Sequence, residues 1–205
     1  NLIILISFIL SSLLSYKYLN QYDDYSKYRE GKHPMIKIAV LNHWYEAQAI
    51  LDDMKKGKSF WQAGKKKTDE FLPQKILAFY YYLINKEPLL NNKIKTNNGK
   101  LLYLVLKSML YYSILYLLSK KLKKIIPQKN ILFVVLFLAC IPDIFQYHSS
   151  FWNESLFYSF QLLLIYFFID YSSNFFRNVI IGLLVGLMYS ISQEYLLYIF
   201  VLIII

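Results

Sequence analysis

The sequence has few of the residues on which disulfide-stapled and metal-dependent folds rely. Of its 205 residues only Cys140 is a cysteine, and it lies within an apolar run. A single cysteine forms no intramolecular disulfide and excludes a site built from several thiolates. The three histidines, His33, His43 and His148, are scattered and belong to no metal-binding motif. We therefore expect no cofactor, with a divalent metal left open.

Acidic residues and glycine-rich motifs are also scarce. The chain has 13 acidic against 23 basic residues, for a net charge of +10. The lysines cluster at the ends of apolar runs and form no basic stripe interleaved with aromatics, so membrane lipids rather than nucleic acid are the expected partners. The absence of a glycine-rich phosphate loop argues against a nucleotide ligand.

Apolar residues, by contrast, are abundant. Hydrophobic residues make up 57% of the chain and aromatic residues 19%, which exceeds the usual content of a soluble domain. The sequence therefore predicts a membrane protein. It begins inside an apolar run without Met, and it ends at Ile205 in another apolar run without a helix cap. We expect it to be the N-terminal part of a longer membrane protein.

The apolar runs divide the chain into three regions. Residues 1–19 form a predicted first transmembrane helix, residues 20–100 a mostly polar folded loop, and residues 101–205 a set of further spans. These further spans are predicted at residues 101–118, 131–144, 156–168, 179–191 and from 196 onwards. The predicted fold class is all-α: a polytopic transmembrane helical bundle with a large outer loop that contains amphipathic interfacial helices.

Charge in the short loops predicts the orientation. The lysine cluster at residues 120–129 and Arg177 should be cytoplasmic under the positive-inside rule. The loop at residues 20–100 and the turns at residues 143–154 and 192–194 then lie outside. We expect a multi-pass integral protein of a bacterial inner (plasma) membrane with its active site outside. Gly182 and Gly186 form a small-xxx-small pair, which predicts close approach of a neighbouring helix.

Two helices are predicted within the outer loop. In residues 42–60, Ala47, Ile50, Leu51 and Met54 recur at helical spacing, and Gly57 ends the pattern. Such an amphipathic helix either lies on the bilayer and presents carboxylates to a site, or simply exposes its charges to water.

The second predicted loop helix, at residues 71–84, spans about 14 residues, short of the roughly 20 that cross a bilayer. Pro73 at its start and Lys75 within it favour a helix at the membrane interface, with a short true span as the alternative.

The predicted outer face gathers the polar residues that could form a site. An acidic residue at the edge of a span is costly unless it faces a wet cavity or a partner, although a helix-start carboxylate is the simpler explanation. The residues of this face are Asp23, Asp24, His43, Tyr45, Glu46, His148, Trp152, Asn153, Glu154, Gln193 and Glu194.

The order of these elements resembles a known superfamily. The residues that carry the likeness are, in order, 45–49, 57–60, 71–73, 153–157, 182–186 and 192–194. This order resembles the GT-C superfamily of polyprenyl-phosphate-sugar-dependent glycosyltransferases, which includes protein mannosyltransferases and aminoarabinose transferases of lipid A. The resemblance implies transfer of a sugar from a polyprenyl-phosphate-linked donor to an envelope lipid, glycan or protein acceptor.

The chemistry of such a site needs a base for the acceptor hydroxyl and positive groups for the donor phosphate. The resemblance implies a catalytic carboxylate at Asp23, Asp24 or Glu46, with His43 as an alternative base, because Asn42 and His43 stand where superfamily members usually carry an acidic pair. Expected substrate-binding residues are Tyr45, Lys75, Trp152, Glu154, Gln193 and Glu194, with the lysines at residues 65–67 as further phosphate ligands.

Two other classes of function remain open from the sequence. A transporter or flippase uses charges inside its spans, and here these are limited to cases such as Lys107. A non-catalytic membrane protein of polysaccharide assembly shares the composition but needs no ordered carboxylate in the outer loop.

Overall fold

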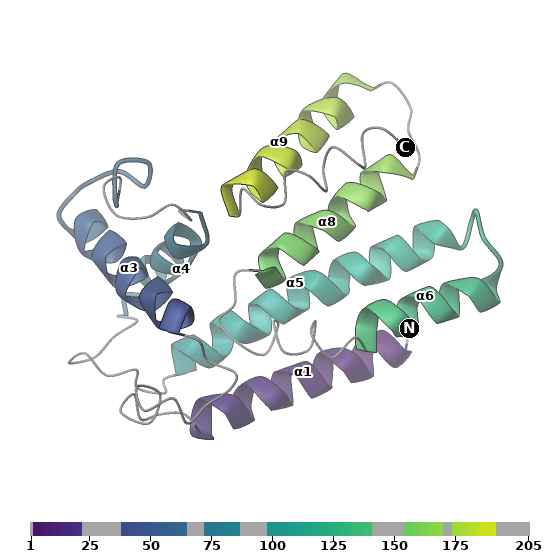
Figure 1. The fold of residues 1–205 in the computed structure, drawn as a ribbon, viewed down its shortest axis with the longest axis horizontal. Coiled ribbons are helices and arrows are strands. Elements are labelled where there is room, and N and C mark those ends of the chain that lie inside the picture. The colour runs from purple at the N-terminus through teal and green to yellow at the C-terminus, as the bar shows by residue number, and fades with distance from the viewer. Residues whose placement is uncertain are drawn as a thin grey trace. The chain divides into compact units, whose positions relative to one another are not determined.

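The described part of the chain is entirely helical. The computed structural model describes residues 2–21, 38–64, 72–86, 98–140, 154–169 and 174–191, and within these ranges it contains no strand. The helices in Figure 1 are α1 (Leu2–Gln21), α3 (Ile38–Lys55), α4 (Leu72–Leu83), α5 (Asn98–Leu122), α6 (Gln128–Cys140), α8 (Glu154–Phe168) and α9 (Phe175–Ile191). The predicted all-α class is confirmed over these ranges.

The chain divides into two compact units. Unit 1 combines Asn1–Leu13 with Val105–Ile205, and unit 2 is Leu14–Leu104. Helices α1 and α5 each contribute to both units. The loop predicted at residues 20–100 falls entirely within unit 2.

Unit 1 has a hydrophobic core centred on α5. Buried side chains from α1, α5, α6 and α8 form one cluster, whose members include Ile4, Tyr111, Leu115, Leu118, Val135 and Leu162. The α5 members recur every three or four residues, so one face of the helix is buried. Two polar contacts cross between helices: Ser11 Oγ lies 3.1 Å from Ser108 Oγ, and Tyr111 Oη donates to the Leu138 carbonyl at 2.9 Å.

One described helix is both long and apolar enough to cross a membrane. Its apolar stretch, Gly99–Leu122, has 24 residues and extends about 36 Å, against a hydrocarbon core of about 30 Å. The apolar helices α6, α8 and α9 have 13, 15 and 17 residues, and the apolar part of α1 is Leu2–Lys17. The predicted polytopic bundle is therefore not confirmed, because a 13-residue helix covers only about 20 Å.

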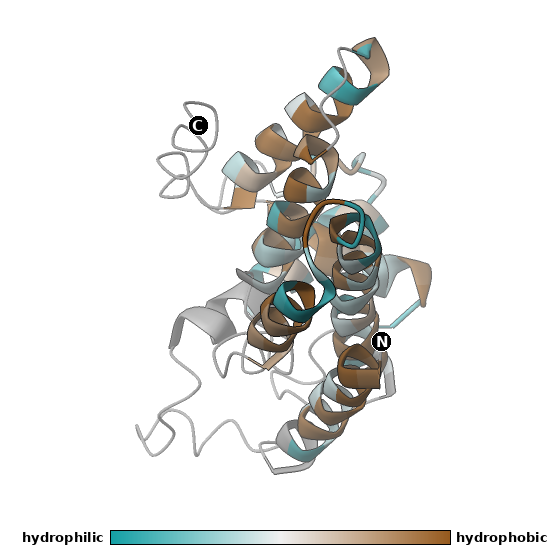
Figure 2. Cartoon of the chain, turned by 90° about the vertical axis from the view of Figure 1, so that its right-hand side faces the viewer, coloured by the Kyte–Doolittle hydropathy of each residue, from teal (hydrophilic) through white to brown (hydrophobic). Residues whose placement is uncertain are grey.

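Large apolar side chains are exposed on several helices of unit 1. The relative exposure is 72% for Phe133 of α6 and 62% for Leu183 of α9. In Figure 2 the helix that begins at the N label, α1, is brown along most of its length. Apolar surface of this extent is unfavourable in water and typically marks contact with lipid or another protein.

The glycine pair of α9 does not make the predicted close approach. Helix α9 contacts α8 and buries Leu184, Met188 and Ile191. At 100° per residue, Gly182 and Gly186 lie on the opposite side of the helix. Within the described residues no heavy atom lies within 4 Å of a Cβ built at either glycine. The prediction is wrong for the described neighbours because the larger apolar residues provide the packing face.

In unit 2, α3 and α4 pack against each other as a helical hairpin. Helix α3 buries the predicted face, Ala47, Ile50, Leu51 and Met54, so this part of the prediction is confirmed. The predicted stop is confirmed as well. Gly57 has a φ of +89°, its amide donates to the Met54 carbonyl, and the Lys58 amide donates to the Asp53 carbonyl, a Schellman ending.

Helix α4 is short, as predicted, and its lysine is buried. It has 12 residues, too few to span. It buries Lys75, Leu77, Ala78 and Tyr81, so the lysine lies inside the hairpin. The reason is that hydrogen-bond acceptors are available to the ammonium group within the fold. The location of α4 at the membrane interface stays a prediction.

Two glycines allow a matched test of the helix ending. Gly57→Ala should lower stability by about 1 kcal/mol or more, because its φ of +89° is unfavourable for a residue with a Cβ. Gly182→Ala, in an exposed helical position with open space around it, should instead raise stability by about 0.5 to 1 kcal/mol. Thermal melting of the purified protein measures both, and equal effects of the two substitutions would contradict the assigned helix ending.

Candidate functional site

Two of the predicted site residues, Tyr45 and Glu46, lie in the first half of α3. Tyr45 is exposed and Glu46 is half-buried, while Ala47 next to them is fully buried against the hairpin core. Glu46 and Asp53 are about two helical turns apart and so lie along one flank of α3. Glu46, the predicted base, therefore lies on the same side of α3 as Asp53, which precedes the turn at residues 56–64.

Asp53 ties this turn back to α3. Its Oδ1 accepts a hydrogen bond from Lys58 Nζ at 2.8 Å, and its Oδ2 accepts one from the Gly64 amide at 3.1 Å. The hydrogen bond from Lys58, followed by that from Gly64, lowers the pKa of the Asp53 carboxyl group. The carboxylate is thus bonded to both ends of the segment between Lys58 and Gly64.

Lys75 holds the same turn from α4. Its side chain is 2% exposed, and Nζ donates to the Phe60 carbonyl at 2.7 Å and to the Trp61 carbonyl at 3.1 Å. The ammonium group also lies 5.2 Å from the centre of the Phe60 ring and 5.8 Å from that of Trp61. These contacts give Lys75 a positioning role within the fold. Its predicted contact with a donor phosphate stays a prediction.

Aromatic rings surround this buried charge. The Phe60 ring makes edge contacts with Trp61 at 5.1 Å and Phe79 at 5.7 Å between centroids. Trp61 itself is 72% exposed, so it presents a large apolar surface beside the turn. Sequence reasoning missed these residues as a group, since Phe60 follows the end predicted for the first loop helix and Phe79 belongs to the second.

Tyrosines connect the hairpin to the start of α5. Tyr80 Oη donates to the Gly99 carbonyl at 2.6 Å, and its ring lies 5.3 Å from that of Tyr103. Burial raises the pKa of Tyr80, and burial with a smaller contribution from Tyr80 raises the pKa of Tyr81. Both phenols therefore remain neutral at ordinary pH. Gly99 is the first residue of the candidate span.

Most of the other predicted site residues are not described. Asp23, Asp24, His148, Trp152, Asn153, Gln193 and Glu194 lie outside the described residues, as do the lysines at 65–67. The backbone of His43 is part of α3 and Glu154 is the first residue of α8, but their side chains are outside the description. The predicted convergence of carboxylates is therefore untested. Tyr45 and Glu46 lie on α3 and Lys75 lies on α4 of the same hairpin, where its ammonium group contacts the turn at Phe60 and Trp61.

Three half-buried carboxylates lie on α3, those of Glu46, Asp52 and Asp53, and the two aspartates accept hydrogen bonds from neighbouring groups of the hairpin. Glu46 can accept a proton from a hydroxyl group that approaches its exposed side, and Tyr45 offers a ring and a hydroxyl next to it. In the ranges that the structure describes, no group of three or more His, Cys, Asp or Glu side chains is placed to bind a metal.

Replacing the buried lysine tests its positioning role. Lys75→Met keeps the apolar stem and removes two charge-assisted hydrogen bonds, so the turn should open more easily by about 2 kcal/mol, or about 30-fold. Tryptic cleavage after Lys58, followed by mass spectrometry, measures the opening. Lys86→Met, at an exposed position, is the control and should leave the cleavage rate unchanged. The same rate in both variants would show that Lys75 does not hold the turn.

Comparison with protein-family models, with characterised proteins and with solved structures gives no match to this chain. The resemblance to the GT-C superfamily accordingly rests on the order and spacing of the sequence motifs.

Proposed function

We propose that the protein is a multi-pass integral membrane glycosyltransferase of the GT-C type, with its active site on the outer face. It transfers a sugar from a polyprenyl-phosphate-linked donor to an envelope lipid, glycan or protein acceptor. The observation that carries the proposal is the attachment of the hairpin to one end of the candidate span.

This attachment is made by Tyr80. Its hydroxyl group donates to the carbonyl of Gly99, where the span begins, and its ring lies against Tyr103 one turn further on. Tyrosines concentrate where a protein passes from water into lipid, because their rings are apolar and their hydroxyl groups hydrogen-bond. The hairpin thus has the contacts expected of a domain resting at the membrane surface.

Charge at the other end of α5 supports an outer location for the hairpin. The last turn of α5 contains Lys120 and Lys121, and Lys123 and Lys124 follow directly. A basic cluster beside a span favours the cytoplasmic side, so the opposite end, with Gly99, belongs outside. The exposed apolar side chains of α1, α6 and α9 are consistent with further helices in contact with lipid.

In this proposal the donor's phosphate is the leaving group, and the protein supplies the base. Glu46 is the described candidate, with Asp23, Asp24 and His43 as the alternatives. Tyr45 lies beside Glu46, and Trp152, Glu154, Gln193 and Glu194 are the further residues proposed to contact substrate. Lys75 contributes by keeping the turn next to this surface in place.

One observation favours a second candidate, a transporter or flippase. Lys107 lies within the candidate span and is 4% exposed. A buried ionisable residue at membrane depth commonly marks a pathway for an ion or a polar substrate. A flippase moves its lipid between leaflets and leaves the sugar on the carrier, so the transfer assay below separates the two functions.

The orientation can be tested with single cysteines in a Cys140→Ser background. A cysteine at Lys56, an exposed residue just after α3, should react with a membrane-impermeant maleimide on intact spheroplasts. A cysteine at Lys124, equally exposed just after α5, should react only after the membrane is permeabilised. Labelling of both positions from one side would contradict the proposed topology.

The transfer itself can be tested with a panel of synthetic polyprenyl-phosphate sugars and the full-length protein. Release of sugar from the carrier, followed by mass spectrometry, should be nearly abolished in Glu46→Gln, because a general base contributes about 10²- to 10⁴-fold. Asp52→Asn is the matched control on the same helix: its Oδ1 can still accept the hydrogen bond from Gln48, so activity should be kept. Unimpaired release by Glu46→Gln would exclude Glu46 as the base.

A further inference from the structure

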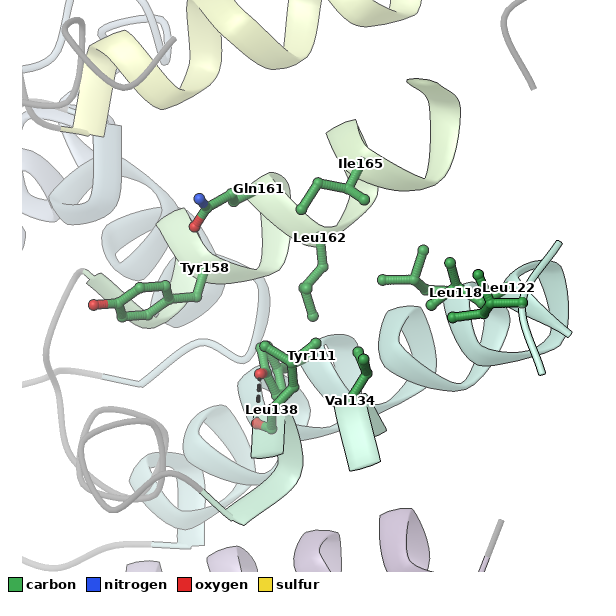
Figure 3. Close-up of a pocket in the computed structure, with 10 residues that line it drawn as sticks. Tyr111, Leu118, Leu122, Val134, Leu138, Tyr158, Gln161, Leu162 and Ile165 are labelled. Atoms are coloured by element: carbon green, nitrogen blue, oxygen red, sulfur yellow. Dashed lines mark hydrogen bonds between the residues drawn. The ribbon is translucent and has the colours of Figure 1, made fainter. Parts of the chain in front are cut away.

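A groove in unit 1 runs between α5, α6 and α8. Its volume is about 330 Å³. Ten side chains line it: Tyr111, Leu118, Leu122, Ile126, Val134, Leu138, Tyr158, Gln161, Leu162 and Ile165. In Figure 3, Tyr158 and Gln161 lie at one end of the groove, and Leu118 and Leu122 lie at the other.

The wall of the groove suits an aliphatic chain. Seven of the ten side chains are aliphatic, and the hydroxyl group of Tyr111 donates to the Leu138 carbonyl, so this tyrosine offers mainly its ring. From Tyr111 to Leu122 the groove follows α5 for about 16 Å. A narrow apolar groove of this length fits one extended hydrocarbon chain better than a compact polar ligand.

One end of the groove is strongly basic. Leu122, the last residue of α5, and Ile126, in the turn before α6, both line it, and the exposed Lys123 and Lys124 lie between them in the sequence. Backbone hydrogen bonds from Lys124 to Lys121 and from Ile126 to Leu122 hold this turn in shape. The two exposed lysines thus belong to a turn whose backbone is held in shape next to the apolar end.

A further lysine, Lys121, lies at this end, against one carboxylate in the neighbouring sequence, Asp170, which stands two residues after α8. Lys121 Nζ donates to the Tyr166 carbonyl of α8 at 2.6 Å and lies 4.2 Å from the centre of the Tyr166 ring. The sequence from residue 88 to residue 142 contains no Asp or Glu. The basic end is thus complementary to an anion attached to a hydrocarbon chain.

We propose that the groove binds one acyl chain of an anionic phospholipid of the cytoplasmic leaflet, whose phosphate is held by Lys123 and Lys124. The proposal rests on the membrane placement described under the proposed function and is independent of sugar transfer. It identifies a lipid site within unit 1, beside the C-terminal end of α5, and this lipid of the cytoplasmic leaflet is distinct from the sugar donor, which the proposed function places on the outer face.

Native mass spectrometry of the detergent-solubilised full-length protein tests the site. The probes are phosphatidylglycerol and phosphatidylcholine with identical acyl chains. The protein should retain phosphatidylglycerol with at least about tenfold higher affinity, because only this headgroup has a net negative charge to pair with the lysines. Equal retention of the two lipids would overturn the assignment of the headgroup and with it the proposal.

Variants then locate the bound lipid. Leu138→Trp fills the groove and should abolish the preferential binding, while Leu136→Trp, at an exposed position of the same helix outside the groove, should keep it. Lys123→Gln with Lys124→Gln should remove the preference for phosphatidylglycerol. Lys56→Gln with Lys86→Gln is the control of equal charge change at exposed positions of unit 2 and should have no effect.

The outcomes are separable from those of the proposed function. Should Leu138→Trp fail to fold, the smaller change Val134→Phe serves the same purpose. The lipid site is overturned if Leu138→Trp and Leu136→Trp bind the lipid equally well. It is also overturned if the Lys123/Lys124 pair and the Lys56/Lys86 pair of substitutions have the same effect. Sugar release remains measurable in each of these variants, so loss of the lipid site leaves the transfer proposal standing, and failure of transfer leaves the lipid site standing.

Discussion

The hairpin of unit 2 depends on a charge that is kept out of water. Burying the Lys75 ammonium group is unfavourable unless it is fully hydrogen-bonded, and the carbonyls of Phe60 and Trp61 together with their rings offset this cost. The same bonds satisfy the carbonyl groups of Phe60 and Trp61 in the turn. Asp53 fixes that turn from α3, so two opposite charges on two helices hold one short segment.

Helix α5 is the second element on which the structure depends. It takes part in both units, it contains the one described stretch suited to crossing a membrane, and its buried face centres the core of unit 1. Its two ends differ in chemistry, since tyrosines contact the start and lysines follow the end. This asymmetry carries the proposed orientation of α5.

The proposed site was predictable only in part. Local pattern was enough for α3, because a buried face at helical spacing and a glycine with positive φ are properties of neighbouring residues. It was not enough for Lys75. The sequence shows a lysine in a short apolar helix, but its partners lie 14 and 15 residues earlier in the chain, and only the packing of α4 on α3 brings them together.

The sequence by itself determined that the described ranges are helical, where α3 ends, and that the apolar content is high, because these follow from composition and from periodicity along the chain. Tertiary structure decided which polar groups are buried and which small residues meet a neighbour. Among the described residues nothing lies within 4 Å of a Cβ built at Gly182 or Gly186, because larger side chains on the opposite side of α9 form its packing face. Burial depends on which faces pack together, and no local pattern specifies that choice.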